Sequence, residues 1–159
     1  MREKEDTMNV GLQLNYLWHD VDVYELEVIA SNSQFSGAAR TYLSIGGLVE
    51  AAEALEGFPR DLSDARDLEF GAFGRDFAGG GAHFRFFCKD SAGHAVVEIR
   101  IESEHERNSG SRWNLPAQTV QFFGEIEASA VDDFVSELRQ LEENKNGFAL
   151  LRFINSLTC

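Results

Sequence analysis

Alternating charged and apolar side chains in the middle of the chain predict two paired strands. Residues 95–102 alternate with a period of two, and Val97 and Ile101 fall on the inward side, as in a strand with one solvated face. Residues 84–89 alternate in the same way. Residues 90–93 between them tolerate turn dihedrals, so the two segments predict a hairpin.

The hairpin also has a predicted register. With a two-residue tip within residues 90–93, Phe86 lies opposite Val97. The same register places Arg85 opposite Glu98 on the solvated side. Each cross-strand pair of this kind contributes on the order of 0.2–1 kcal/mol, so the apolar pair and the charged pair support one alignment.

A further strand and a helix follow this hairpin. Residues 119–127 resume strand alternation, and the apolar residues of 131–141 then recur at helical spacing. Ser129 is a suitable N-cap, and Asp132 three residues later resembles the second half of a capping box. Gly147 suits a left-handed position after the helix.

The first half of the chain predicts the same order of elements. Strands are expected within residues 12–16, 24–28 and 35–43, and helical spacing follows in residues 48–55. Residues 57–59, Gly-Phe-Pro, form a strong helix stop. A strand-strand-helix arrangement is therefore predicted twice.

The predicted fold class is α+β. We expect a largely antiparallel sheet of about six strands with both amphipathic helices packed on one of its faces. A chain of 159 residues with 43% hydrophobic content suits a single domain over residues 1–159, with a loosely ordered lead-in over residues 1–10. The opposite, solvated face is predicted to carry Glu25, Glu27, Arg85, Glu98, Arg100 and Glu102.

Net charge restricts the partners. The formal charge of −13 repels phosphate backbones and anionic lipid, so neither nucleic acid nor a membrane is expected as a partner. No apolar run of about 18 residues occurs, and the charged start lacks the apolar region of a signal peptide. These features predict a cytoplasmic protein.

Catalytic and metal signatures are weak. Glycines within residues 71–81 precede a strand rather than a helix, so a flexible approach to the hairpin explains them better than a phosphate loop. His19, Asp20 and Asp22 are the densest set of potential metal ligands, but zinc-type spacing is missing and a solvated strand entry is favoured. The sequence predicts no catalytic residue, no metal site and no cofactor.

Acidic side chains give the strongest functional indication. Those of the central unit are predicted to gather near one end of the sheet and to attract a basic protein by long-range electrostatics. The alternative is that they serve colloidal stability alone. The predicted partner-binding residues are Glu98, Glu102, Glu104, Glu106, Glu125, Glu127, Asp132 and Asp133.

Four segments, residues 22–28, 35–37, 57–59 and 93–98, also support a family resemblance. Within residues 18–143 the chain resembles a group of small, acidic, mostly uncharacterised bacterial proteins. Some of these are similar to predicted immunity proteins of the WapI type, which neutralise a toxin. The resemblance carries over no catalytic residue.

Three hypotheses for function follow. The first is a non-catalytic protein-binding module, immunity-like, that neutralises a basic toxin partner. The second is a small hydrolase or a metal-binding or ligand-binding domain that uses His19, Asp20 and Asp22. The third is a structural homo-oligomer that associates through the acidic sheet face.

Overall fold

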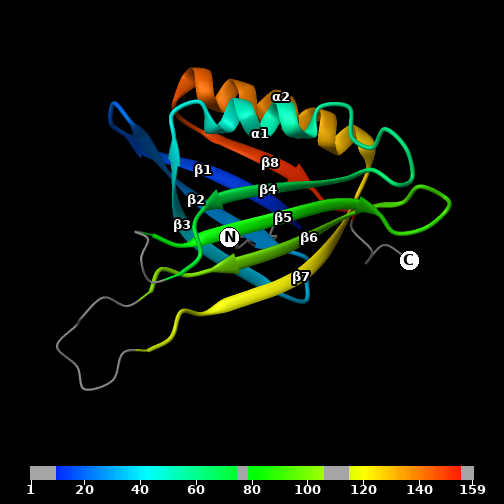
Figure 1. The fold of residues 1–159 in the computed structure, drawn as a ribbon, viewed down its shortest axis with the longest axis horizontal. Helices are drawn as coiled ribbons and strands as arrows, with labels where there is room; N and C mark the ends of the chain where they lie inside the picture. Colours follow the sequence, from blue (N-terminus) through cyan, green and yellow to red (C-terminus); the bar gives the residue numbers. More distant parts are fainter. Residues whose placement is uncertain (1–9, 75–78, 106–114, 155–159) are drawn as a thin grey trace, which may run out of the picture.

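The computed structural model describes residues 10–74, 79–105 and 115–154, and these residues form eight strands and two helices. Figure 1 shows their arrangement. In chain order the elements are β1 (Gly11–His19), β2 (Val23–Ser31), β3 (Ser36–Ser44), α1 (Gly47–Leu55), β4 (Ala65–Gly71), β5 (Gly81–Cys88), β6 (Ala95–Glu102), β7 (Thr119–Ile126), α2 (Ala128–Asn144) and β8 (Phe148–Arg152).

The strands form two antiparallel sheets. The first has the order β3-β2-β1-β8 and the second has the order β4-β5-β6-β7. The α+β class is therefore correct, but the prediction of one sheet with about six strands has to be corrected to two sheets of four strands. Period-two alternation reports that a segment is a strand and gives no information on which sheet it joins.

Strand β3 lies against the ends of all four strands of the second sheet. The backbone N–H of Gly80 donates to the Arg40 carbonyl of β3 at 2.7 Å. A Cβ on Gly80 would lie 2.4 Å from the Glu102 carbonyl oxygen, and a Cβ on Gly71 would lie 2.3 Å from the Gly80 carbonyl oxygen. These two glycines therefore allow close backbone packing where the sheets meet.

The two helices close the opening between the sheets. They lie side by side, and α1 also contacts β4 of the second sheet while α2 contacts β8 of the first (Figure 1). The two helices, predicted to cover one face of a single sheet, thus each contact an edge strand of a different sheet. One core cluster of buried apolar side chains includes residues from both sheets and both helices.

The ends of α2 differ in how well the sequence predicted them. The helix begins at Ala128 after an N-cap at Glu127 that makes no side-chain capping bond, so the proposed Ser129 cap and capping box are wrong. At the other end, Lys145 and Gly147 both have positive φ, and the N–H of Lys145 donates to the Leu141 carbonyl at 3.0 Å. This end follows the predicted left-handed termination.

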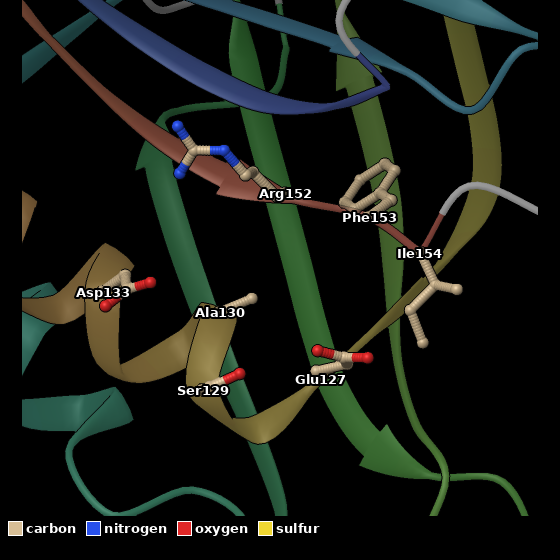
Figure 2. Close-up of a pocket in the computed structure, with 7 residues that line it drawn as sticks. All are labelled: Glu127, Ser129, Ala130, Asp133, Arg152, Phe153 and Ile154. Carbon is tan, nitrogen blue, oxygen red and sulfur yellow. The ribbon is translucent and has the colours of Figure 1, made fainter.

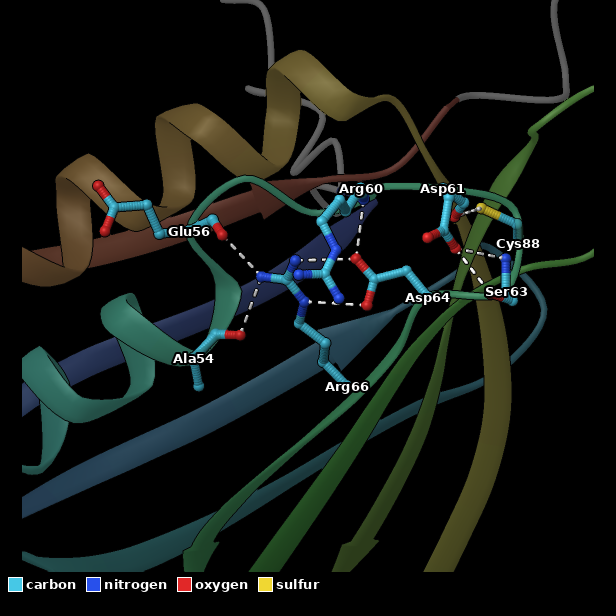
Figure 3. A network of polar contacts seen from close by, with 8 residues as sticks. All are labelled: Ala54, Glu56, Arg60, Asp61, Ser63, Asp64, Arg66 and Cys88. Atoms are coloured by element: carbon cyan, nitrogen blue, oxygen red, sulfur yellow. Dashed lines mark hydrogen bonds and ion pairs between the residues drawn. The ribbon is translucent and has the colours of Figure 1, made fainter.

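Arg66 joins the end of α1 to β4 (Figure 3). Its guanidinium donates to the backbone carbonyls of Ala54 at 3.2 Å and Glu56 at 2.7 Å. The same group forms a two-point contact with the Asp64 carboxylate and lies 5.6 Å from the centre of the Phe58 ring. Arg66 thus satisfies carbonyls that a helix leaves free at its C-terminus.

The predicted hairpin register is confirmed. Phe86 pairs with Val97 and Arg85 pairs with Glu98 between β5 and β6. Two residues of the predicted solvated face nevertheless prove to be buried. Glu25 lies beneath Trp18, whose indole N–H donates to its carboxylate, and Glu102 is buried beside His105. Their polar partners make burial of these carboxylates possible.

Candidate protein-binding site

Most of the predicted acidic residues on β6 and β7 already have partners within the chain. The Gln121 side-chain amide donates to Glu98 at 2.8 Å, and the His105 ring nitrogen lies 2.5 Å from the Glu102 carboxylate. Glu125 forms an ion pair with Lys89. These contacts engage the three carboxylates within the fold, and the Lys89 ion pair offsets the charge of Glu125.

Glu104, a further predicted residue, follows β6 two residues after Glu102. The exposed carboxylate of Glu104 accepts a hydrogen bond from the backbone N–H of Gly79 at 3.2 Å. Glu106 falls outside the described residues, so the structure does not place it.

The acidic residues do not gather at one end of the sheet. Glu102 pairs with Thr119 at one end of the β6–β7 ladder, whereas Ala95 pairs with Ile126 at the other end, next to Glu125. With a rise of about 3.3 Å per residue, the two ends are on the order of 20 Å apart. The expected single patch is therefore divided into two groups.

The second group adjoins a surface pocket at the start of α2 (Figure 2). The pocket has a volume of about 440 Å³ and combines two predicted acidic residues with one cation and three apolar side chains. Glu127 and Asp133 are presented by α2 and the residue before it, and Arg152 projects from the end of β8. The lining residues are Glu127, Ser129, Ala130, Asp133, Arg152, Phe153 and Ile154.

Packing of the chain after β8 shapes this pocket. The Phe153 ring lies over Gly124, where a Cβ would come within 2.6 Å of the ring. The N–H of Ile154 donates to the Glu125 carbonyl of β7 at 2.7 Å. Two lining residues, Phe153 and Ile154, are thus held by contacts with β7, which is distant in sequence, so no local pattern could have indicated the pocket.

Carboxylates also accumulate over both helices, which sequence analysis missed. Helix α1 carries two acidic residues and no basic one, while α2 carries five acidic residues and one arginine, Arg139. We call these seven, together with the residue after α1 and the residue before α2, the acidic helical layer. Its members are Glu50, Glu53, Glu56, Glu127, Asp132, Asp133, Glu137, Glu142 and Glu143.

Arg139 compensates only one of these charges, that of Glu56, with which it pairs at 3.2 Å. Most members of the layer are exposed, while Glu137 and Glu142 are half-buried. Burial raises the pKa of Glu137, and the nearby Arg152 opposes that effect. The acidic polar face of each helix was readable from the sequence, but the packing of α1 against α2 was not.

Tyr24 holds the two helices in position beneath the layer. Its hydroxyl donates to the Glu142 carboxylate at 3.2 Å and accepts a hydrogen bond from the Leu48 N–H at 2.7 Å. Burial raises the pKa of Tyr24, and the Glu142 carboxylate raises it further despite the opposing Leu48 bond. The phenol therefore stays protonated and serves as a link between β2, the start of α1 and the end of α2.

The proposed metal ligands His19, Asp20 and Asp22 lie at the tip of the β1–β2 hairpin. One carboxylate oxygen of Asp20 accepts the N–H groups of Asp22 and Val23, both at 2.8 Å. These backbone bonds lower the pKa of Asp20. Across residues 10–74, 79–105 and 115–154, no three His, Cys, Asp or Glu side chains are grouped so that they could hold a metal ion.

The last observations concern membrane-spanning helices and similarity to known proteins. Neither of the described helices has the length and apolar character needed to cross a bilayer. No protein-family model matches the chain, and no curated protein matches it.

Proposed function

We propose that this chain is a non-catalytic protein-binding module whose acidic helical layer covers a basic surface of its partner. The main support is the imbalance of seven carboxylates against one arginine on two adjacent helices. Like charges at this spacing repel and lower the stability of the fold. A cationic partner would relieve that repulsion on binding. A binding role therefore explains a charge excess that lowers the stability of the isolated fold.

The outer face of the second sheet provides an internal comparison. Its carboxylates have basic side chains beside them: Asp67 lies 2.9 Å from His83, Glu125 pairs with Lys89, and Arg85 lies opposite Glu98. Acidic residues kept for solubility alone would not need to be concentrated on one surface. The local excess on the helices therefore favours recognition over colloidal stability.

The expected partner follows from the family resemblance. An immunity protein of the WapI type neutralises a toxin, so a basic toxin is the partner that we propose. Complementary charge would accelerate the encounter and would make the association sensitive to salt. Among the acidic residues predicted from the sequence, we assign the binding role to Glu127, Asp132 and Asp133, which are exposed and belong to the layer.

The test is a titration with the purified product of the neighbouring open reading frame at low and high salt. We expect association that weakens with salt, and an association rate that falls by about three- to tenfold in the double variant Asp132→Asn/Asp133→Asn. The matched control, Asp67→Asn/Glu69→Gln, removes two charges from β4 and should change the rate by less than about twofold. Equal losses in the two variants would show that only net charge matters and would refute a specific face.

A further inference from the structure

Large apolar side chains are exposed on the β1–β2 hairpin and in the turn after β3. Val21 is 91% exposed, Trp18 is 44% exposed and Leu17 is 41% exposed. Ile45, which follows β3, is 40% exposed and lines a surface depression of about 580 Å³ with Val21. We call these four residues the hairpin knob. Grouped apolar exposure of this kind marks interaction surfaces more often than scattered single residues do.

The knob is held rigidly. Besides the two bonds to its side chain, Asp20 donates its N–H to the Val23 carbonyl at 2.9 Å. The N–H of Ile45 donates to the Asp22 carbonyl at 3.0 Å, which fixes the turn after β3 to the hairpin tip. An apolar group presented in a fixed turn loses little conformational entropy on binding, so it is suited to act as an anchor.

A β-bulge lies within the part of β1 that contributes to the knob. The register between β1 and β2 shifts between Tyr16 and Trp18, which leaves Leu17 without a partner. The polar atom of Trp18 is satisfied by Glu25, and its ring meets the Tyr42 ring edge-on at 6.4 Å between centres. The remaining ring surface is oriented and open to solvent, as in aromatic residues that anchor interfaces.

The knob adjoins the acidic helical layer. In Figure 1 the β1–β2 hairpin projects beyond the body at the side where α1 begins and α2 ends. Lys145, directly after α2, lines the same depression as Val21 and Ile45. Asp20 and Asp22 flank Val21 in sequence. The Tyr24 hydroxyl accepts from the Leu48 N–H at the start of α1 and donates to the Glu142 carboxylate, so this carboxylate also lies near the start of α1. Carboxylates of the hairpin and of α2 thus lie beside the apolar surface and outnumber the single lysine, Lys145, that lines the depression.

From this arrangement we infer that the hairpin knob is the apolar anchor of the binding surface. Its partner site would be an apolar socket bordered by lysine or arginine side chains. The inference rests on the proposed function, since it adds an apolar contact at one end of the acidic helical layer. It also defines the partner chemically: a positive surface without such a socket would bind weakly.

The experiment uses random dodecapeptides displayed on phage, selected against the whole chain at low salt. We expect the enriched peptides to combine basic residues with a large apolar residue. A synthetic copy of an enriched peptide should alter the fluorescence of Trp18, measured in a Trp113→Phe background. Val21→Ser should weaken its binding by about tenfold, because the substitution removes the most exposed apolar contact.

Leu62→Ser is the matched control, because Leu62 is 54% exposed in the loop between α1 and β4, away from the knob. It should leave peptide binding within about twofold of wild type. Val21 is almost fully exposed, so the Val21→Ser variant is expected to fold, and its far-ultraviolet circular dichroism confirms this before binding is measured.

The outcomes separate the two proposals. If Asp132→Asn/Asp133→Asn weakens binding while Val21→Ser behaves like Leu62→Ser, the anchor is refuted and the proposed function stands. If Val21→Ser weakens binding but the enriched peptides carry no excess of basic residues, the charge-based function is refuted together with the basic border of the socket. A selection that enriches no peptide dependent on Val21 also overturns the inference.

Discussion

Asp64 accepts three hydrogen bonds in the loop between α1 and β4. Two come from the Arg66 guanidinium, at 3.2 and 2.8 Å, and one comes from the Arg60 N–H at 2.8 Å. The Arg66 bond, and then the Arg60 bond, lower the pKa of Asp64. At the residue scale, this carboxylate stabilises the fold because its charged form is bonded only when the chain is folded.

Asp64→Asn is therefore expected to show a pH-dependent loss of stability. At pH 7 the free energy of unfolding should fall by about 1–2 kcal/mol, because a charge-assisted bond pair is lost. The folded-state pKa lies below the unfolded value of about 3.9, so the stabilisation is present above that value and is lost as pH falls through the folded pKa. Urea denaturation of both proteins between pH 7 and pH 2.5 measures this convergence.

The control for that measurement is Asp132→Asn, which removes an exposed carboxylate from α2. Its effect on the free energy of unfolding should stay within about 0.5 kcal/mol. A difference between wild type and Asp64→Asn that is the same at pH 7 and pH 2.5 would contradict the role given to the ionised carboxylate.

At the scale of elements, close packing between β3 and the second sheet depends on particular glycines. Gly80 lies against the backbone of β6, and its N–H bonds to β3. Gly57, after α1, has a φ of +75° but has nothing within 4 Å of the position of a Cβ. The first glycine is required by space, whereas the second is required only by its backbone conformation.

Gly80→Ala should consequently destabilise the protein more than Gly57→Ala. The added Cβ of the first variant meets a backbone carbonyl that cannot rotate away, and we expect a loss above about 3 kcal/mol or a failure to fold. Gly57→Ala should cost about 1–2 kcal/mol from the left-handed backbone alone. Thermal unfolding ranks the two, and equal melting temperatures would contradict the close approach of β3, β5 and β6.

Local patterns predicted the elements well and their assembly poorly. The pairing of Phe86 with Val97 was readable because a short turn fixes the register of a hairpin. The division into two sheets was not readable from the sequence. It depends on contacts between distant segments, such as the hydrogen bond from the Gly80 N–H to the Arg40 carbonyl, and the periodicity of side chains does not record such contacts. The acidic helical layer was only half visible for the same reason: Asp132 and Asp133 were identified, but α1 was not known to lie beside them.

At the scale of the whole molecule, one core connects all the layers. Leu26 of the first sheet, Phe84 of the second, Leu48 of α1 and Phe134 of α2 are all fully buried in the same cluster. Neither sheet has a separate apolar interior, and the helices complete the enclosure at the edge strands. A single shared core is the usual basis of cooperative unfolding.

We therefore expect the chain to unfold in one transition. In a Trp113→Phe background, fluorescence of Trp18 reports on the first sheet, while far-ultraviolet circular dichroism reports on all the elements. The two signals should give the same urea midpoint and the same free energy of unfolding. Separate midpoints would mean that the two sheets unfold independently.

The order of strands in the first sheet affects how this protein folds during synthesis. Strand β8 pairs with β1, although the entire second sheet and both helices lie between them in the chain. Until β8 leaves the ribosome, β1 keeps one row of backbone donors and acceptors without their strand partner, and such an edge can pair with another nascent chain. The interval between translation of β1 and of β8 is thus when this protein is most exposed to aggregation.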